Sequence, residues 1–178
     1  FIKDNDLIDN HGLQAYFNKR LHQIITKYNK KMMGWDEIMY PQLPNDITIQ
    51  SWRGRDAMML AAESGIPSLL SSNFYIDLCQ PAWFHYQNDP LPDDTKLTEA
   101  QKKFILGGEA TMWSELVNEE TIDSRIWPRT AAIAERLWSS NKNNDAADMY
   151  KRLQDMELVL EELGIAHKKN QPVLMRRF

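Results

Sequence analysis

The strongest constraint on the fold is the alternation of strand-like and helical segments along the chain. Residues 12–29 repeat apolar side chains at helical spacing, and residues 31–38 are typical of a short buried strand that ends before Pro41 and Pro44. Further strands are predicted at 47–52, 68–75 and 103–108, and further helices at 55–64, 128–139 and 145–163. Strands connected in this way predict an α/β fold with a parallel sheet.

The length limits which α/β architecture is available. Four strands with their helices match either a small open sheet or half of a (β/α)₈ barrel, and a complete barrel needs about 250 residues. This chain has 178 residues, so we interpret residues 1–178 as a single unit. Asn10 is the expected N-cap of the first helix, and Gly164 is expected to end the last one. The proline-containing stretch 79–98 is expected to be a long loop.

Composition excludes several function classes. The net charge is −4 with both signs mixed along the chain, which argues against a nucleic-acid surface. No apolar run approaches the length of a membrane span. The single cysteine, Cys79, excludes an internal disulfide and a cysteine-based metal cluster, and the four histidines lack ligand spacing. We therefore expect no metal and no cofactor. The basic end, with Lys168, Lys169, Arg176 and Arg177, is interpreted as a solvated tail.

Aromatic residues and carboxylates recur together near the predicted strand ends. In three places an aromatic residue is followed two positions later by an acid, and on extended backbone such side chains point the same way. A pocket with tryptophan walls and carboxylate acceptors suits a sugar. A core role for the tryptophans is the competing interpretation, because a single Trp near a strand end is more often buried. The positions are Trp35-x-Glu37, Trp52, Tyr75-x-Asp77 and Trp113-x-Glu115.

The adjacent acids Asp36 and Glu37 resemble a catalytic pair but fit that role poorly. Glycosidases usually place two carboxyl groups opposite each other across the scissile bond. Neighbours on a strand point to opposite faces, so only one of these two acids is expected to face a pocket. We expect Glu37 to point the same way as Trp35 and Asp36 to be structural.

Residues 107–140, GGEATMWSELVNEETIDSRIWPRTAAIAERLWSS, closely resemble the last strand and helix of family 20 glycoside hydrolases, the β-N-acetylhexosaminidases. The segments GWDEI, QSWRG and NFYIDL follow the order and spacing of that family's later barrel strands. The resemblance runs from about residue 10 to about residue 166. It implies that the chain holds strands five to eight of a (β/α)₈ TIM barrel, the C-terminal half of the catalytic domain.

The resemblance also implies a reaction and a role for each matching residue. The family removes terminal N-acetylglucosamine or N-acetylgalactosamine from glycans with retention, and the substrate's own acetamido oxygen is the nucleophile. Tyr75 matches the catalytic tyrosine that bonds this oxygen. The other matching residues bind substrate: Trp35, Trp52 and Trp113 form walls, and Asp77 and Glu115 bind the O4 and O6 hydroxyls of the sugar.

One part of the family pattern does not occur in this sequence. The family's catalytic Asp-Glu pair lies on the fourth strand, within a pattern like His-x-Gly-Gly-Asp-Glu, which this chain lacks. We therefore expect the chain alone to be inactive and, as an open half-barrel, to self-associate. A non-catalytic carbohydrate-binding module and a structural domain are the alternatives. The family suggests a secreted, periplasmic or lysosomal parent protein.

Overall fold

The computed structural model describes residues 1–41 and 44–169. These residues form two compact units, which are described separately: unit 1 contains Phe1–Leu70 and Thr95–Leu106, and unit 2 contains Ser71–Asp94 and the chain from Gly107 onward. The helices are α1 (Asn10–Lys27), α2 (Arg55–Glu63), α3 (Ala82–Tyr86), α4 (Glu99–Lys102), α5 (Ile122–Ile126), α6 (Arg129–Trp138) and α7 (Ala146–Glu162), with 3₁₀ turns η1 (Lys3–Asn5) and η2 (Asp36–Ile38). The strands are β1 (Met33–Trp35), β2 (Thr48–Ser51), β3 (Ser68–Leu70) and β4 (Ile105–Gly108).

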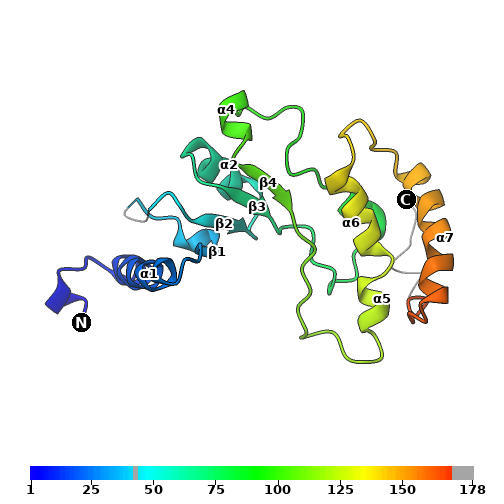
Figure 1. Ribbon diagram of the computed structural model, residues 1–178, viewed down its shortest axis with the longest axis horizontal. Coiled ribbons are helices and arrows are strands. Elements are labelled where there is room, and N and C mark those ends of the chain that lie inside the picture. The colour runs from blue at the N-terminus through cyan, green and yellow to red at the C-terminus, as the bar shows by residue number, and fades with distance from the viewer. Residues whose placement is uncertain (42–43, 170–178) are drawn as a thin grey trace. The chain divides into compact units, whose positions relative to one another are not determined.

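The four strands form one sheet in the order of the chain, β1-β2-β3-β4 (Figure 1). β1 pairs with β2 and β2 with β3, both in parallel, and Gly34 lies opposite Ile49 in the first pair. Next to β4, the amide of Ser68 donates to the carbonyl of Phe104 at 2.8 Å. Parallel neighbours in chain order, with helices in the connections, are the arrangement of part of a TIM barrel. The expected fold class is confirmed.

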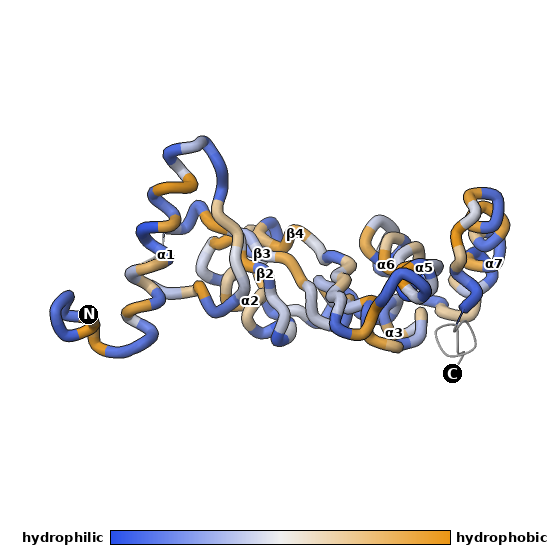
Figure 2. The backbone as a smooth tube through the Cα atoms, turned by 90° about the horizontal axis from the view of Figure 1, so that it is seen from below, coloured by the Kyte–Doolittle hydropathy of each residue, from blue (hydrophilic) through white to orange (hydrophobic). Residues whose placement is uncertain are grey.

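The core of unit 1 lies where α1, α2 and η2 meet the sheet. Ile47, Ile49 and Ala61 are almost completely buried there, and α2 packs on β2 and β3. Burial of the β-branched side chains of Ile47 and Ile49 against α2 stabilises these short strands. α1 alternates apolar and polar residues along its length (Figure 2), and it leaves Phe17 and Ile24 exposed.

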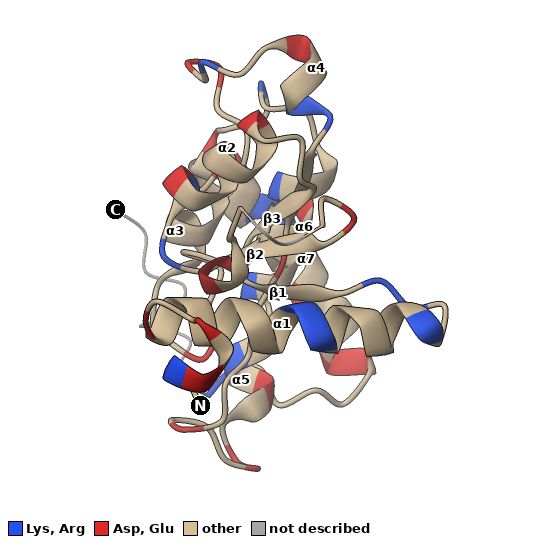
Figure 3. Cartoon of the chain, turned by 90° about the vertical axis from the view of Figure 1, so that its left-hand side faces the viewer, with Lys and Arg blue, Asp and Glu red and all other residues tan. Residues whose placement is uncertain are grey.

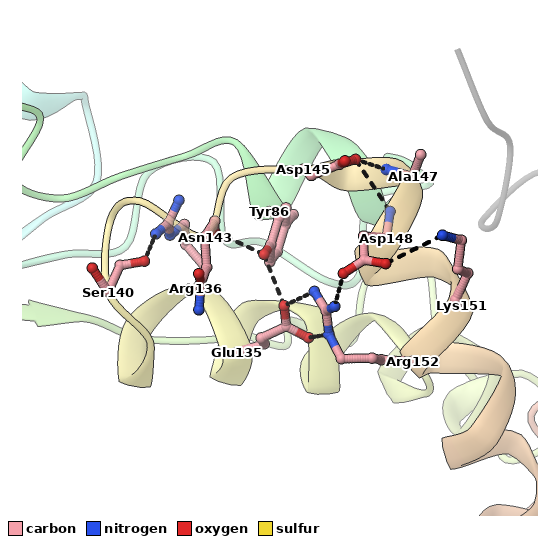
Figure 4. Close-up of polar contacts among 10 residues, drawn as sticks. All are labelled: Tyr86, Glu135, Arg136, Ser140, Asn143, Asp145, Ala147, Asp148, Lys151 and Arg152. Atoms are coloured by element: carbon pink, nitrogen blue, oxygen red, sulfur yellow. Dashed lines mark hydrogen bonds and ion pairs between the residues drawn. The ribbon is translucent and has the colours of Figure 1, made fainter.

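The core of unit 2 gathers α3, α6 and α7. Tyr86, Ala132 and Met149 are fully buried in it. A polar network borders this core beside a cavity of about 410 Å³ (Figure 4). The hydroxyl of Tyr86 donates to Glu135 at 2.7 Å, and Arg152 donates to both oxygens of Glu135 at 2.5 and 3.0 Å. Burial raises the pKa of Tyr86 to about 12, and the hydrogen bond from Arg152 holds the pKa of Glu135 below its usual value.

Several boundaries differ from those expected. The first helix is capped by Asp9, which accepts from the amide of Gly12 at 2.9 Å, and not by Asn10. The expected strand 68–75 ends at Leu70, and the stretch 79–98 contains α3. Short helices such as α3 are missed because a five-residue apolar run carries no clear period. Gly164 follows the last helix with a positive φ of 71°, as its conformational freedom suggests.

Charged residues of both signs occur along the described chain, and two lysines near its end form ion pairs. Figure 3 shows acidic and basic residues interspersed along the ribbon. At the basic end, Lys168 pairs with Glu161, and Lys169 pairs with Glu120 at 2.9 Å. Arg176 and Arg177 lie outside the described residues. Among residues 1–41 and 44–169, no helix is long and apolar enough to cross a membrane.

The ion pair between Glu135 and Arg152 predicts a loss of stability in acid. The folded pKa of Glu135 lies below its ordinary value of 4.5, so its contribution to stability is present above that pH and is lost as the pH falls through the lowered pKa. Arg152→Met should therefore make the free energy of unfolding depend less steeply on pH below 4.5, measured by urea denaturation. Lys102→Met is the control, because its partner Glu99 is exposed. Equal pH slopes for Arg152→Met and the parent chain would contradict this assignment.

Candidate functional site

In unit 1, Trp52 and Glu37 are hydrogen-bonded to each other. Trp52 directly follows β2 and is 43% exposed. Its indole Nε1 donates to Oε1 of Glu37 at 2.9 Å. The other oxygen, Oε2, is buried and has no hydrogen-bond partner among the described residues. Trp35 ends β1 in the same unit. Glu37 therefore fixes the orientation of one large, partly exposed aromatic ring.

Asp36 binds the residue that follows Trp52. Its side chain is completely buried, and Oδ1 accepts from the Nη2 of Arg53 at 2.6 Å and from its Nε at 2.7 Å. This carboxylate raises the pKa of Arg53 through that hydrogen bond. The two adjacent acids thus hold the segment after β2 at two successive positions, Trp52 and Arg53.

The argument that strand alternation separates Asp36 from Glu37 is wrong. β1 ends at Trp35, and both acids lie in η2, where successive side chains are about 120° apart. The same correction applies to Trp35-x-Glu37, because these two residues do not lie on one extended strand. Turn geometry and separate partners, rather than the alternation of a strand, keep the two acids from facing each other as a pair.

In unit 2, a parallel bridge fixes the segment that contains Tyr75 and Asp77. Tyr75 lies opposite Thr111 in this bridge. The amide of Ile76 donates to the carbonyl of Thr111 at 2.9 Å, and the amide of Thr111 donates to the carbonyl of Phe74 at 3.0 Å. Asp77 is only 6% exposed, and its Oδ1 has no hydrogen-bond partner among the described residues. A buried carboxylate oxygen without a donor is unusual and needs an explanation.

The residues that follow Tyr75 contact Arg129, which the sequence analysis did not single out. Arg129 is completely buried, and its Nη1 donates to the carbonyls of Leu78 at 2.6 Å and Gln80 at 2.9 Å. Its Nη2 donates to the carbonyl of Ile76. The only signal in the sequence is an arginine at the start of the apolar helical run PRTAAIA.

His85 completes the surroundings of Arg129. Its Nδ1 lies 2.7 Å from the carbonyl of Asn73, and its Nε2 lies 3.4 Å from Nη1 of Arg129. Burial lowers the pKa of His85 to about 4 and that of Arg129 to about 10. At neutral pH the imidazole is therefore neutral while the guanidinium is charged. Nδ1 then carries the proton and donates it to Asn73, which leaves Nε2 as an acceptor.

The last pair from the sequence analysis lies in the segment that follows β4. Trp113 is 42% exposed, and Glu115 is exposed as well. This segment contains no helix or strand before α5. Within the described part of the chain, no three His, Cys, Asp or Glu side chains are grouped so that they could hold a metal ion.

Comparison with known proteins identifies a family that this chain matches. Residues 1–141 match the catalytic domain of glycosyl hydrolase family 20. The chain is 31% identical to the β-hexosaminidase of Porphyromonas gingivalis over 92% of its own length and 23% of that protein. It is 33% identical to the rat β-hexosaminidase subunit α, over 93% of this chain and 33% of the subunit.

Solved structures give the same result. The chitobiase of Flavobacterium johnsoniae is 47% identical and superimposes with a TM-score of 0.90, over 97% of this chain and 28% of the chitobiase. The exo-β-N-acetylglucosaminidase of Vibrio harveyi, 24% identical with a TM-score of 0.83, shares the fold. The chain thus spans about a quarter to a third of the length of these proteins. With the parallel sheet and the match over residues 1–141 in agreement, the chain belongs to glycosyl hydrolase family 20.

Proposed function

We propose that the chain is the C-terminal part of the catalytic barrel of a β-N-acetylhexosaminidase. The whole enzyme would remove terminal N-acetylglucosamine or N-acetylgalactosamine from glycans with retention, through the substrate's acetamido group. The observation that carries the proposal is the buried carboxylate of Asp77, whose Oδ1 lacks a donor among the described residues. Leaving such an acceptor unsatisfied costs free energy, and a sugar hydroxyl would supply the missing donor.

The remaining roles follow the family pattern, and the local geometry supports some of them. Tyr75 would donate its hydroxyl to the acetamido oxygen, and Glu115 would bind a second sugar hydroxyl. Trp35, Trp52 and Trp113 would pack against the sugar. Trp52 and Trp113 are each more than 40% exposed, which leaves ring surface available for stacking. Glu37 would act on the sugar only through Trp52, to which it is hydrogen-bonded.

The general acid/base of the reaction would come from a part of the protein outside this chain. Asp36 is bound to Arg53, and Glu37 accepts from Trp52 through Oε1 while its Oε2 is buried, so neither carboxyl group is exposed to a leaving-group oxygen. A positioned general acid or base typically contributes about 10²- to 10⁴-fold. Without it, the residues described here bind and orient a sugar but do not cleave it.

The chain alone should therefore not hydrolyse a chromogenic N-acetylglucosaminide above the rate in buffer. The purified chain is assayed beside the full-length protein in which it lies, which serves as the active control. Hydrolysis by the chain that disappears in Glu37→Gln would show instead that Glu37 is the catalytic acid.

In the full-length protein, Asp77→Asn should lower kcat/KM by about 10- to 100-fold, because a hydrogen bond to a charged group contributes about 1.5–3 kcal/mol. The loss should be much smaller for a 4,6-dideoxy substrate, which lacks the hydroxyls assigned to the carboxylates. Asp155→Asn, an exposed position on α7, is the matched control. An equal loss on both substrates would remove Asp77 from sugar binding.

The isolated chain should also self-associate. Phe17 and Ile24 share one face of α1 and are 63% and 55% exposed, Tyr28 directly after the helix is 69% exposed, and β1 lies at an edge of the sheet. Covering this apolar face with a second copy would remove it from water. Light scattering at micromolar concentration should give a mass above 20.8 kDa, and Ile24→Lys should lower it. A monomeric mass for the unsubstituted chain would contradict the proposal.

A further inference from the structure

We propose that Arg129 is a positioning residue for the sugar-binding segment: it fixes the backbone on both sides of Asp77 and thereby sets the direction of its carboxylate. This inference rests on the proposed function for the role of Asp77 in sugar binding. The placement of Arg129 itself is a matter of contacts within unit 2.

The contacts of Arg129 follow alternate residues of the segment. Its guanidinium donates to the carbonyls of Ile76, Leu78 and Gln80. Residues 76–78 form a bend, and none of the described strands supplies donors to these carbonyls. Arg129 supplies the donors instead. Its contacts with residues 76 and 78 bracket Asp77 directly.

Thr111 holds the start of the same segment. Its carbonyl accepts from the amide of Ile76 at 2.9 Å, and its own amide donates to the carbonyl of Phe74 at 3.0 Å. The backbone is therefore held by Thr111 before Asp77 and by Arg129 on both sides of it. With these groups held, little rotation of the backbone at Asp77 is available to redirect its side chain.

The chemistry of arginine explains why this residue type suits the position. None of the described carboxylates forms an ion pair with the guanidinium, so carbonyl dipoles carry most of the compensation for its buried charge. Burying a charge without such compensation is costly. A planar group with five N–H donors can reach several carbonyls at once, whereas the ammonium of lysine is a compact point charge. Lysine would keep the charge and lose the simultaneous contacts.

His85 restrains the guanidinium from a further side. Its neutral ring accepts from Nη1 of Arg129 through Nε2 at 3.4 Å, while Nδ1 is held by the carbonyl of Asn73 at 2.7 Å. The fourth carbonyl, that of Arg125, accepts from Nη2 at 2.5 Å. The guanidinium is thus itself fixed, which is what a positioning role requires.

The test is Arg129→Lys in the full-length protein, assayed with the N-acetylglucosaminide and with its 4,6-dideoxy analogue. We expect kcat/KM to fall at least tenfold on the hydroxylated substrate and much less on the analogue, so that the ratio between the two substrates collapses. In an Asp77→Asn background, Arg129→Lys should add less than a twofold loss, because Asp77 can no longer be positioned.

Arg136→Lys is the matched control. Arg136 is the other buried arginine of α6, but it donates to the carbonyl of Ser140 at 3.1 Å and lies over the ring of Tyr86. It should leave the substrate ratio unchanged. Equal losses on both substrates for Arg129→Lys, or losses that add to those of Asp77→Asn, would overturn the inference and leave Arg129 with a purely structural role.

Two further measurements keep the outcomes distinct. If Arg129→Lys fails to fold, His85→Gln takes its place. It should lower the ratio of kcat/KM between the hydroxylated substrate and its analogue by a smaller factor, and an unchanged ratio would overturn the inference.

If the unsubstituted full-length protein hydrolyses neither substrate, the proposed function fails. Amide hydrogen exchange in the chain then tests the role of Arg129. Exchange at residues 76–80 should then be faster in Arg129→Lys while exchange at Ile49 in unit 1 is unchanged, and equal rates would overturn the inference.

Discussion

Unit 2 depends on a buried charge that forms no ion pair with any of the described carboxylates. The guanidinium of Arg129 is shielded from water and donates to four backbone carbonyls, those of Ile76, Leu78, Gln80 and Arg125. These carbonyls would otherwise need a strand or water. Because each of them also needs a donor, the two terminal nitrogens of the arginine and the backbone satisfy each other, and removing either leaves unsatisfied groups in the interior. Helix α6 is thereby joined to the segment that carries Tyr75 and Asp77.

In unit 1, two carboxylates hold neighbouring segments together, as the guanidinium of Arg129 does in unit 2. Asp36 and Glu37 begin a single 3₁₀ turn after β1, and they bind Arg53 and Trp52 after β2. One pair of neighbouring carboxylates thus links two parallel strands beyond the point where the backbone ladder stops. Adjacent acids beside a tryptophan look like a catalytic centre in the sequence, but the structure gives each of them a structural partner.

The longer helices and the apolar strands could be predicted from the sequence, whereas the short helical turns could not. α1, α2, α6 and α7 follow from helical spacing, and the strands follow from apolar runs between turn residues. The 3₁₀ turn at Asp36 and helix α3 are decided by tertiary partners such as Arg53 and Tyr150, which no local pattern reveals. For the site, the pairs of aromatic and acidic residues led to the segments described above, and their role in sugar binding stays a prediction. The spacing argument failed at Trp35 and Glu37 because the strand is shorter than expected, and Arg129 was missed because a buried arginine looks like a surface one in sequence.

The bridge between Tyr75 and Thr111 couples two segments that are far apart in the sequence. Thr111 precedes Trp113 by two residues, so the hydrogen bonds that fix Tyr75 also fix the start of the segment that carries Trp113. The two segments are therefore coupled through their backbones. A substitution that displaces the backbone at Thr111 would also remove two hydrogen bonds from the segment that carries Tyr75.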